Sequence, residues 1–411
     1  MIVKNNVPEI RFKGFSDEWV QHNLGKLIDI RSAARVHKEQ WTESGVPFFR
    51  TSDVVSIYKG QENTKAFISY DVYKELTGRI GKVSSGDLLV TGGGSIGIPF
   101  LVPNDEPLYF KDADLLWFKN DQKFDGYFLY TFLFSETFKK YIKSISHIGT
   151  IAHYTIEQAK STPINNCERA EQTAIGNTFH KLDNLINQHQ QKHDKLSNIK
   201  KAMLEKMFPK QGETIPEIRF KGFSGEWKER SWRDTVDIST NMVDPRCSQY
   251  GELFHVGPGN IESFTGMFYN NVLKVKDSNL ISGKFYFNEG DIIYGKINPQ
   301  LAKYVIAPFE GLASADAYVL NTKNGVVQNY LYVILQTEDF YKYTVSVSSR
   351  TGMPKINRDE LNIYTYLSPD EAEQHKIGNY FQKLDALINQ HQQQITKLNN
   401  IKQACLSKMF V

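Results

Sequence analysis

Two segments of this chain occur twice in the same order, and this duplication limits how it can fold. Segment 8–19, PEIRFKGFSDEW, returns at 216–227 with eleven of twelve residues identical. A longer segment, 171–208, returns at 373–410 with 26 of 38 residues identical. The stretches between these repeats barely resemble each other. Near-identical frames around divergent inserts predict one scaffold that is built twice and presents two different surfaces.

The longer repeated segment has the pattern of a helix that pairs with another helix. Apolar residues alternate at spacings of three and four, which is typical of a coiled-coil seam. The predicted seam residues are Ile175, Phe179, Leu182, Ile186, His189 and Leu196 in the first copy, and Ile377, Phe381, Leu384, Ile388, His391 and Leu398 in the second. Forty helical residues span about 60 Å, too long for one small domain to bury the stripe. We therefore predict that the two helices pair, as an antiparallel coiled coil if the halves are related by a pseudo-twofold axis. The two histidines are interpreted as polar residues that set the register of the seam.

Capping and breaking residues predict where these helices begin and end. Pro209 and Gly212 follow the first helix. Ser368 is the predicted N-cap of the second helix and Pro369 its first residue, and Asn166 occupies the matching cap position in the first copy. The predicted organisation is a first divergent domain at 1–165, a first long helix at 166–209, a second divergent domain at 210–367 and a second long helix at 368–411.

The divergent domains have the pattern of mixed α/β structure. A Gly-Asp turn followed by an apolar run occurs in both, at 86–90 and 290–294. Segments 128–141 and 330–341 have the spacing of amphipathic helices. Further strands are predicted at 47–49, 98–102, 115–118, 305–307 and 318–320. We therefore predict an α+β protein in which two mixed α/β domains share one fold and are separated by two long helices.

Charge and cysteine content narrow the class of protein. The net charge of +3 is too small to prove an anionic partner, although it permits a local basic face. The three cysteines, Cys167, Cys247 and Cys405, have no CxxC spacing, which argues against a disulfide framework or zinc site and suits a reducing compartment. There is no signal-peptide pattern and no apolar stretch of about 18 residues. We expect a cytoplasmic protein without a membrane partner.

Several catalytic or cofactor motifs can be set aside. Residues 92–97 match GxGxxG, but the run 98–103 that follows is typical of a strand, whereas a dinucleotide site needs a helix there. The sequence has no GxxxxGK[ST] loop, and its ten histidines show no metal-ligand spacing. We predict no catalytic residue, no metal site and no cofactor bound by this chain.

The order of these motifs resembles the DNA-specificity subunits of type I restriction–modification systems. The resemblance covers nearly the whole chain. It rests on the Phe-Lys-Gly-Phe-Ser-x-Glu-Trp opening, the Gly-Asp strand signal, a Gly-Thr loop at 149–150 with its counterpart at 351–352, and the helix that begins with Glu-Gln. Each of these features is present in both halves of the chain.

The resemblance implies a role for every part of the chain. Domains 1–165 and 210–367 would be target-recognition domains, each reading one half of a bipartite double-stranded DNA target. The helices would set the spacer and dock two modification (methyltransferase) subunits, and two restriction (motor-nuclease) subunits would join them. S-adenosylmethionine, ATP and Mg would be bound by those partners. The assembly would be a DNA adenine methyltransferase and an ATP-dependent endonuclease, while this chain would have no active site.

Candidate DNA-binding residues lie mainly in polar, basic or glycine-rich loops after strands. Arg and Lys can pair with guanine edges and Asn and Gln with adenine edges, while Ser, Thr and backbone amides hold phosphates. The candidates in the first domain are Arg50, Thr91, Gly93, Ser95, Lys111, His147, Thr150, His153 and Tyr154. Those in the second domain are Lys296, Asn298, Gln300, Lys303, Ser349, Arg350, Thr351 and Lys355.

Two other classes of protein stay open at this stage. An RNA-binding protein would use exposed aromatic side chains for stacking, and the chain has 21 Tyr and 26 Phe. A structural coiled-coil connector would use the two helices, although it would not need two large divergent domains. A free-standing methyltransferase would need an Asn/Asp-Pro-Pro-Tyr/Phe motif, which the sequence lacks.

Overall fold

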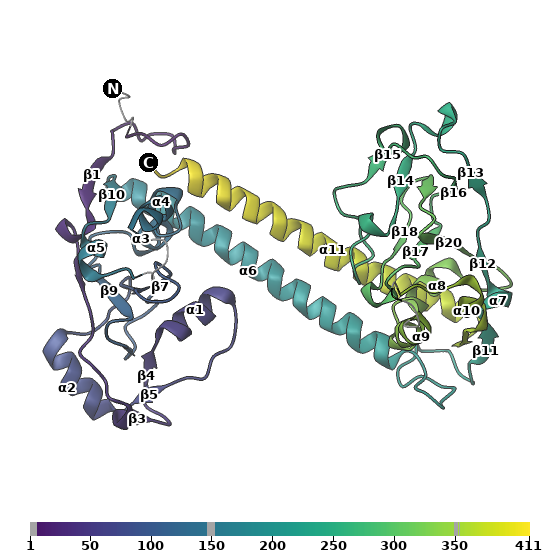
Figure 1. Ribbon diagram of the computed structural model, residues 1–411. Coiled ribbons are helices and arrows are strands. Elements are labelled where there is room, and N and C mark those ends of the chain that lie inside the picture. Colours follow the sequence, from purple (N-terminus) through teal and green to yellow (C-terminus); the bar gives the residue numbers. More distant parts are fainter. Residues whose placement is uncertain (1–5, 146–152, 349–351, 353) are drawn as a thin grey trace. The chain divides into compact units, whose positions relative to one another are not determined.

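The computed structural model describes residues 6–145, 153–348, 352 and 354–411. The chain forms two compact units: unit 1 comprises Met1–Gln190 with Gln393–Val411, and unit 2 comprises Gln191–Gln392. The long helices α6 (Arg169–Lys206) and α11 (Glu371–Lys408), teal and yellow in Figure 1, each contribute residues to both units. The two long helices predicted from the repeat are therefore present. Unit 1 is built from two separate stretches of chain, whereas unit 2 is one continuous stretch.

The described residues of unit 1 form three small sheets. The first is antiparallel with strand order β2-β9-β6-β7, the second has the order β3-β5-β4-β8 with β4 and β8 parallel, and the third pairs β1 with β10. The strands are β1 (Val20–Asn23), β2 (Asp29–Arg31), β3 (Trp41–Thr42), β4 (Val46–Phe49), β5 (Phe67–Ile68), β6 (Leu88–Thr91), β7 (Pro99–Leu101), β8 (Tyr109–Phe110), β9 (Leu115–Lys119) and β10 (Pro163–Asn166). The shorter helices are α1 (Thr51–Lys59), α2 (Tyr70–Ile80), α3 (Gly126–Phe132), α4 (Glu136–Ile145) and α5 (Ile156–Lys160).

Unit 2 repeats two of these three sheets. The sheet β12-β20-β17-β18 matches β2-β9-β6-β7, and the pair β11-β21 matches β1-β10. The third sheet differs, because it has five strands in the order β13-β16-β19-β14-β15. The strands are β11 (Lys228–Ser231), β12 (Val236–Ile238), β13 (Met242–Val243), β14 (Phe254–Val256), β15 (Leu273–Lys274), β16 (Lys284–Phe287), β17 (Ile292–Gly295), β18 (Tyr304–Ile306), β19 (Gly311–Ala313), β20 (Ala317–Thr322) and β21 (Thr365–Ser368). The shorter helices are α7 (Trp232–Thr235), α8 (Gln328–Ile334), α9 (Glu338–Ser348) and α10 (Arg358–Ile363).

The Gly-Asp turn predicted before a strand is confirmed in both units. In unit 1 the carboxylate of Asp87 accepts hydrogen bonds from the backbone N–H of Ser84, the backbone N–H of Asn120 and the indole N–H of Trp117. Burial raises the pKa of Asp87, and these three bonds oppose that rise. Asp291 accepts the matching bond from the N–H of Asn288 at 2.8 Å. The aspartate therefore closes the turn that starts the central strand.

The predicted fold class is confirmed, and the predicted strands coincide with β4, β6, β7, β9, β17, β18 and β20. The prediction of one helix at 128–141 and one at 330–341 was wrong, because each segment forms two helices. Ser135 and Thr337 accept a hydrogen bond from the backbone N–H three residues later, which starts a new helix at each place.

The predicted cap of the second long helix was also wrong. Ser368 is the last residue of β21, and its hydroxyl donates to the carbonyl of Pro369. The side chain of Asp370 caps the helix instead, because its Oδ1 accepts the N–H of Glu373 at 2.8 Å. Asn166 likewise lies in β10, and α6 begins at Arg169. The two residues that we interpreted as caps instead belong to the strand that precedes each helix.

The core of each unit is closed by the end of a long helix. In unit 1, Phe410 packs against Trp19, Phe128 and Phe179 at ring-centroid distances of 6.3, 5.5 and 6.2 Å. In unit 2 the equivalent residue Phe208 packs against Trp227 and Tyr330 at 5.7 and 6.0 Å. The repeated Lys-Met-Phe therefore supplies an aromatic anchor to each core.

Candidate nucleic-acid interface

The short repeated segment is held on the start of a long helix by one buried ion pair in each unit. In unit 1, Arg11 donates two hydrogen bonds to Glu171 at 2.6 and 2.8 Å, and the indole of Trp19 donates a third at 3.1 Å. Arg219 and Glu373 form the same two-pronged pair in unit 2. Both glutamates are almost fully buried, so each needs its arginine.

The glutamine after each of these glutamates joins the helix to the rest of its unit. The Gln172 carboxamide accepts the N–H of Asp125, just before α3, and donates to Asn166 and to the carbonyl of Cys167. Gln374 accepts the N–H of Val327, just before α8, and donates to two carbonyls. The repeated Glu-Gln pair therefore fixes each frame to its long helix.

Within each unit the two long helices run beside each other and are joined by an ion pair (Figure 1). In unit 1, Lys402 of α11 lies 2.5 Å from Asp183 of α6. Asp183 also accepts the hydroxyl of Tyr127 at 2.6 Å, and burial, with the Asp183 contact, raises the pKa of that hydroxyl. In unit 2, Lys200 of α6 lies 2.6 Å from Asp385 of α11. Residues 183 and 200 correspond to 385 and 402 in the repeat, so the predicted antiparallel pairing is present in both units.

The residues predicted for the helix seam differ in their packing. Ile175 and Phe179 are buried in the core of unit 1, and Leu182 packs against it. Ile377, Phe381 and Leu384 are buried in the core of unit 2, with Leu196 packed against it. The side chains of Ile186, His189, Ile388, His391 and Leu398 are half-buried. The first turns of each stripe thus serve the core of a unit as well as the helix pair.

Two loops predicted to bind DNA lie against each other in unit 1. Gly93, just after β6, forms a β-bridge with His153, and the carbonyl of Gly92 accepts the N–H of Tyr154 at 2.8 Å. A Cβ atom at position 92 would lie 2.9 Å from the carbonyl oxygen of Tyr154, so only glycine permits this approach. The glycine-rich loop therefore packs closely against the segment that contains His153 and Tyr154.

The candidates around these loops have two kinds of surroundings. Ser95 and His153 are exposed. Thr91 is fully buried, and its hydroxyl bonds within the loop to the carbonyl of Ser95 and the N–H of Ile98. Tyr154 is buried too, with its hydroxyl 2.5 Å from that of Thr162, and burial raises its pKa. Thr91 and Tyr154 thus support the loop from inside, and Ser95 and His153 face solvent.

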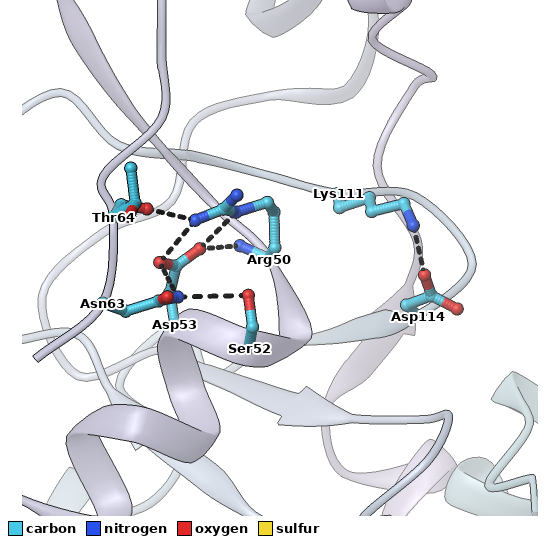
Figure 2. Close-up of polar contacts among 7 residues, drawn as sticks. All are labelled: Arg50, Ser52, Asp53, Asn63, Thr64, Lys111 and Asp114. Atoms are coloured by element: carbon cyan, nitrogen blue, oxygen red, sulfur yellow. Dashed lines mark hydrogen bonds and ion pairs between the residues drawn. The ribbon is translucent and has the colours of Figure 1, made fainter. Parts of the chain in front are cut away.

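Arg50 and Lys111 are both paired with carboxylates of unit 1, as Figure 2 shows. Arg50 precedes α1 and donates from Nε and Nη2 to Asp53 at 2.8 and 3.0 Å, and also to the carbonyl of Thr64. Its guanidinium lies 5.9 Å from the ring centre of Trp41. The hydrogen bond to Asp53 raises the pKa of Arg50. Lys111 lies 2.6 Å from Asp114 and is half-exposed.

The matching two loops of unit 2 also lie against each other. Ile297 forms a β-bridge with Lys355, the N–H of Asn298 donates to the carbonyl of Pro354 at 2.7 Å, and the N–H of Ile356 donates to the carbonyl of Lys296 at 3.0 Å. The loop after the central strand and the loop before α10 therefore form one surface, as they do in unit 1.

This surface of unit 2 carries several cationic and amide side chains. Lys355 and Gln300 are exposed. Lys296 lies over the ring of Tyr318 at 5.6 Å, and the ammonium of Lys303 lies 2.5 Å from the carbonyl oxygen of Pro258. Neither contact neutralises the positive charge of the lysine. Such a surface suits an anionic or hydrogen-bonding partner.

Five predicted residues lie outside the part of the chain that the structure describes: His147, Thr150, Ser349, Arg350 and Thr351. Their assignment to the interface stays a prediction. Sequence reasoning missed the pairs Arg11–Glu171 and Lys200–Asp385, although exact repetition of all four residues at matching positions was a usable signal.

Residues 6–145, 153–348, 352 and 354–411 contain no group of three or more His, Cys, Asp or Glu side chains placed to hold a metal ion. In the same ranges no helix is both long and apolar enough to cross a membrane.

Comparison with known proteins relates this duplicated frame to a family. The family model for the type I restriction modification DNA specificity domain matches residues 16–198 and again residues 247–400, which is most of the chain. The chain belongs to this family. The two matches fall on the two halves of the repeat, so the duplication is a duplication of the family's domain.

The similarity extends to individual members of the family. The chain is 31% identical over 212 residues to the specificity subunit of the type I restriction enzyme EcoDI from Escherichia coli, which is 49% of this chain and 46% of that protein. It is 28% identical over 198 residues to the HindI specificity subunit from Haemophilus influenzae, which is 45% of this chain and 41% of that protein. The matches thus span about half the length of these relatives.

The fold of the whole chain is similar to that of a solved structure. The crystal structure of the S subunit of a type I restriction–modification system from M. genitalium aligns with a TM-score of 0.67 and 15% sequence identity. The alignment covers 98% of this chain and 99% of that one. At this identity the comparison bears on the fold alone, and the alignment includes both units and both long helices of this chain.

Proposed function

We propose that this chain is the non-catalytic, sequence-specific DNA-binding subunit of a type I restriction–modification complex, and that each unit reads one half of a bipartite target. The observation that carries this proposal is the contrast between an identical frame and two different loop surfaces. The ion pairs, the Glu-Gln joints and the aromatic anchors are the same in both units. The loops that meet beside the central strand differ in sequence and charge.

The surface of unit 1 offers mainly backbone and small polar groups. Gly94 and Ser95 are exposed and leave the main chain open to close approach, and the exposed His153 lies beside them, bridged to the buried Gly93. Backbone N–H groups, serine and histidine can donate to phosphate or base-edge oxygens. This half of the chain therefore suits a contact in which the DNA comes close to the loop backbone.

The surface of unit 2 offers side chains instead. Lys296, Lys303 and Lys355 carry positive charge, while Asn298 and Gln300 carry amides. Lysine pairs with guanine O6 and N7 or with phosphate, and an amide pairs with adenine N6 and N7. The two surfaces would thus prefer different base pairs, which is what an asymmetric bipartite target requires.

The helices and their partners complete the proposal. Residues 1–165 and 210–367 are the target-recognition domains. Helices α6 and α11, within segments 166–209 and 368–411, set the spacer between half-sites. The exposed faces of the helices dock two modification subunits, which two restriction subunits join. S-adenosylmethionine, ATP and Mg belong to those partners, which supply the methyl transfer and the DNA cleavage.

DNA-binding titrations test this proposal. The chain is co-expressed with its methyltransferase partner, its target is identified by methylome sequencing of the host, and binding is measured on target duplex, unrelated duplex and double-stranded RNA at two salt concentrations. We expect the target duplex to bind about a thousandfold or more tighter than the unrelated duplex. Preference for RNA, or equal binding of all three, would contradict the proposal.

Substitution of one lysine tests whether the meeting loops of unit 2 contact DNA. Replacing Lys355 with Ala should weaken target binding, and if Lys355 contacts phosphate the slope of log affinity against log salt should fall by about one. Lys323 is the matched control, because it is an exposed lysine of the same unit beside Thr235, away from the meeting loops. An equal loss for Lys323→Ala would show that the effect of Lys355 is only one of net charge.

A further inference from the structure

An exposed aromatic residue of unit 2 is held in a backbone conformation that aromatic residues rarely adopt. Phe264 has φ of +65° and is 53% exposed. Positive φ disfavours residues with a bulky side chain, and burial does not repay the cost here because half of the ring faces solvent. Leucine would fit this backbone conformation as well as phenylalanine does, and serine or glycine would fit it better. The phenyl ring itself is what needs an explanation.

The strained residue belongs to a cluster. Of the eight non-glycine residues with positive φ in the described part of the chain, three lie together: Phe264, Asn298 and Ala302. The N–H of Phe264 donates to the carbonyl of Ala302 at 3.0 Å, and Asn298 and Ala302 flank the single turn Pro299–Leu301. Strained residues cluster where a surface must present a side chain in one fixed way.

Several contacts hold the tip of this loop against the body of unit 2. The carbonyl of Phe264 accepts the hydroxyl of Tyr304 at 3.2 Å, and its ring lies 5.7 Å from that of Tyr341. A Cβ atom at Gly266 would lie 1.9 Å from the hydroxyl oxygen of Tyr332, so the turn fits closely onto the tyrosines below it. The ring of Phe264 is therefore presented on a supported loop.

The same contacts place Phe264 beside the candidate DNA-binding loop. The hydroxyl of Tyr341 donates to the carbonyl of Gln300 at 3.3 Å, so one tyrosine touches both the aromatic tip and the loop. Leu301, next to Gln300, is 40% exposed and adds apolar surface, and Lys303 follows Ala302. An apolar tip flanked by an amide and a cation matches a base pair more closely than it matches a phosphate.

We propose that Phe264 is a specificity-determining residue that stacks on a base, or packs on a base step, in the half-site that unit 2 reads. This inference rests on the proposed DNA-binding function and names the residue that contacts a base face. Stacking contributes affinity because every base offers an aromatic face, and insertion at a base step favours steps that unstack easily. Phe264 would thus select a deformable step while Gln300 and the lysines read or hold its neighbours.

The test compares substitutions that keep the backbone conformation. Phe264→Asn and Phe264→Gly both tolerate positive φ but remove the ring, whereas Phe264→Tyr keeps a ring. Ile363→Asn is the control, since Ile363 is 71% exposed on α10 and apolar. Each variant of the full chain, with its methyltransferase partner, is titrated with target duplex and unrelated duplex. The target carries 2-aminopurine at each position of one half-site in turn.

We expect Phe264→Asn and Phe264→Gly to lose about 5- to 100-fold in affinity for the target, with a smaller change on unrelated duplex. The midpoint of thermal unfolding should not fall in the glycine variant, because glycine relieves the strain. Phe264→Tyr and Ile363→Asn should bind within about twofold of the parent. The fluorescence change at one 2-aminopurine position should vanish with the ring.

Three outcomes would overturn this inference. They are unchanged target affinity in both ring-less variants, an equal loss on target and unrelated duplex, and a loss of binding that only accompanies unfolding of both variants. Failure of the parent chain to prefer its target would instead contradict the proposed function itself, so the two failures are distinguishable.

Discussion

Arg219 donates two hydrogen bonds to Glu373, from Nε at 2.7 Å and from Nη2 at 2.6 Å. The pair joins a residue of the short repeat to a residue of the long repeat, 154 positions away along the chain. Arg11 and Glu171 form the same pair across 160 positions. The six-residue difference is the difference in length between the two divergent domains, so the frame tolerates domains of different size.

Substitution of Arg219 should lower the stability of unit 2. Glu373 is 1% exposed, so Arg219→Ala leaves a buried carboxylate without its cation and costs about 3–5 kcal/mol in the free energy of unfolding. Arg219→Lys keeps the charge but loses the two-pronged geometry, and should cost less than alanine. Urea unfolding measures both. Arg246→Ala is the control, because Arg246 pairs with Asp244 at the surface and its removal should change nothing measurable.

The helix pair should acquire a new pH dependence when Lys200 is removed. Asp385 is mostly buried, and desolvation raises its pKa, which the ion pair with Lys200 lowers. In Lys200→Met the carboxylate has lost that partner, so its pKa rises further. A raised carboxyl pKa gives stability that is complete below the unfolded value and is lost as pH rises through the folded value. The variant should therefore become more stable on acidification from neutral pH, relative to the parent chain.

The equivalent pair in unit 1 provides the control for this experiment. Asp183 keeps the hydrogen bond from Tyr127 when Lys402 is replaced by Met, so it retains a partner. The pH dependence of Lys402→Met should be weaker than that of Lys200→Met. If the free energy of unfolding depended on pH equally in the two variants, the assignment of the effect to Asp385 would be contradicted.

Arg50 should act on stability more than on DNA affinity. Its guanidinium is bound to Asp53 and to the carbonyl of Thr64 (Figure 2), and Asp53 also accepts from Asn63. Arg50→Ala should cost about 1–3 kcal/mol in the free energy of unfolding because Asp53 loses its cation. Target affinity measured on the folded fraction should stay within about twofold. A large loss of affinity without a loss of stability would restore Arg50 as a DNA contact.

The two long helices could be predicted from the repeat because the apolar pattern of each helix is local and regular. The stripe of Ile175 and Phe179, copied at Ile377 and Phe381, could come only from two similar helices. The caps were mistaken because Ser368 and Asn166 are good cap residues by type, yet the preceding strands pair them with Lys228 and Val20. At both positions, strand pairing outweighs the local preference of the residue for a helix cap.

The candidate site was only partly predictable for a similar reason. Glycines and lysines in loops are visible in the sequence, and the structure does bring Gly93 to His153 and Ile297 to Lys355. Which side chains face inward is not visible, because burial of Tyr154 depends on a partner, Thr162, that no local pattern indicates. Phe264 was missed since its unusual φ leaves no trace in a single sequence.

The long helices should act as a ruler between the half-sites. The sequence of α6 has no glycine or proline between Asn177 and Phe208, so it can transmit a fixed length. Four residues inserted between Gln191 and Leu196, with a matched insertion near Gln393, would add about 6 Å. At about 3.4 Å per base pair, the unspecified spacer should grow by one or two base pairs while both half-sites stay unchanged. An active variant with an unchanged spacer, seen by methylome sequencing, would exclude the ruler.

Exchange of one divergent domain tests most directly the claim that the two units read separately. Residues 228–367 are replaced with the matching segment of a relative that has a different target, while Arg219, Glu373 and the helices are kept. Methylome sequencing of a host that carries the hybrid then gives its target. The account predicts that one half-site changes to that of the relative and the other half-site and the spacer stay the same. A change in both half-sites together would contradict it.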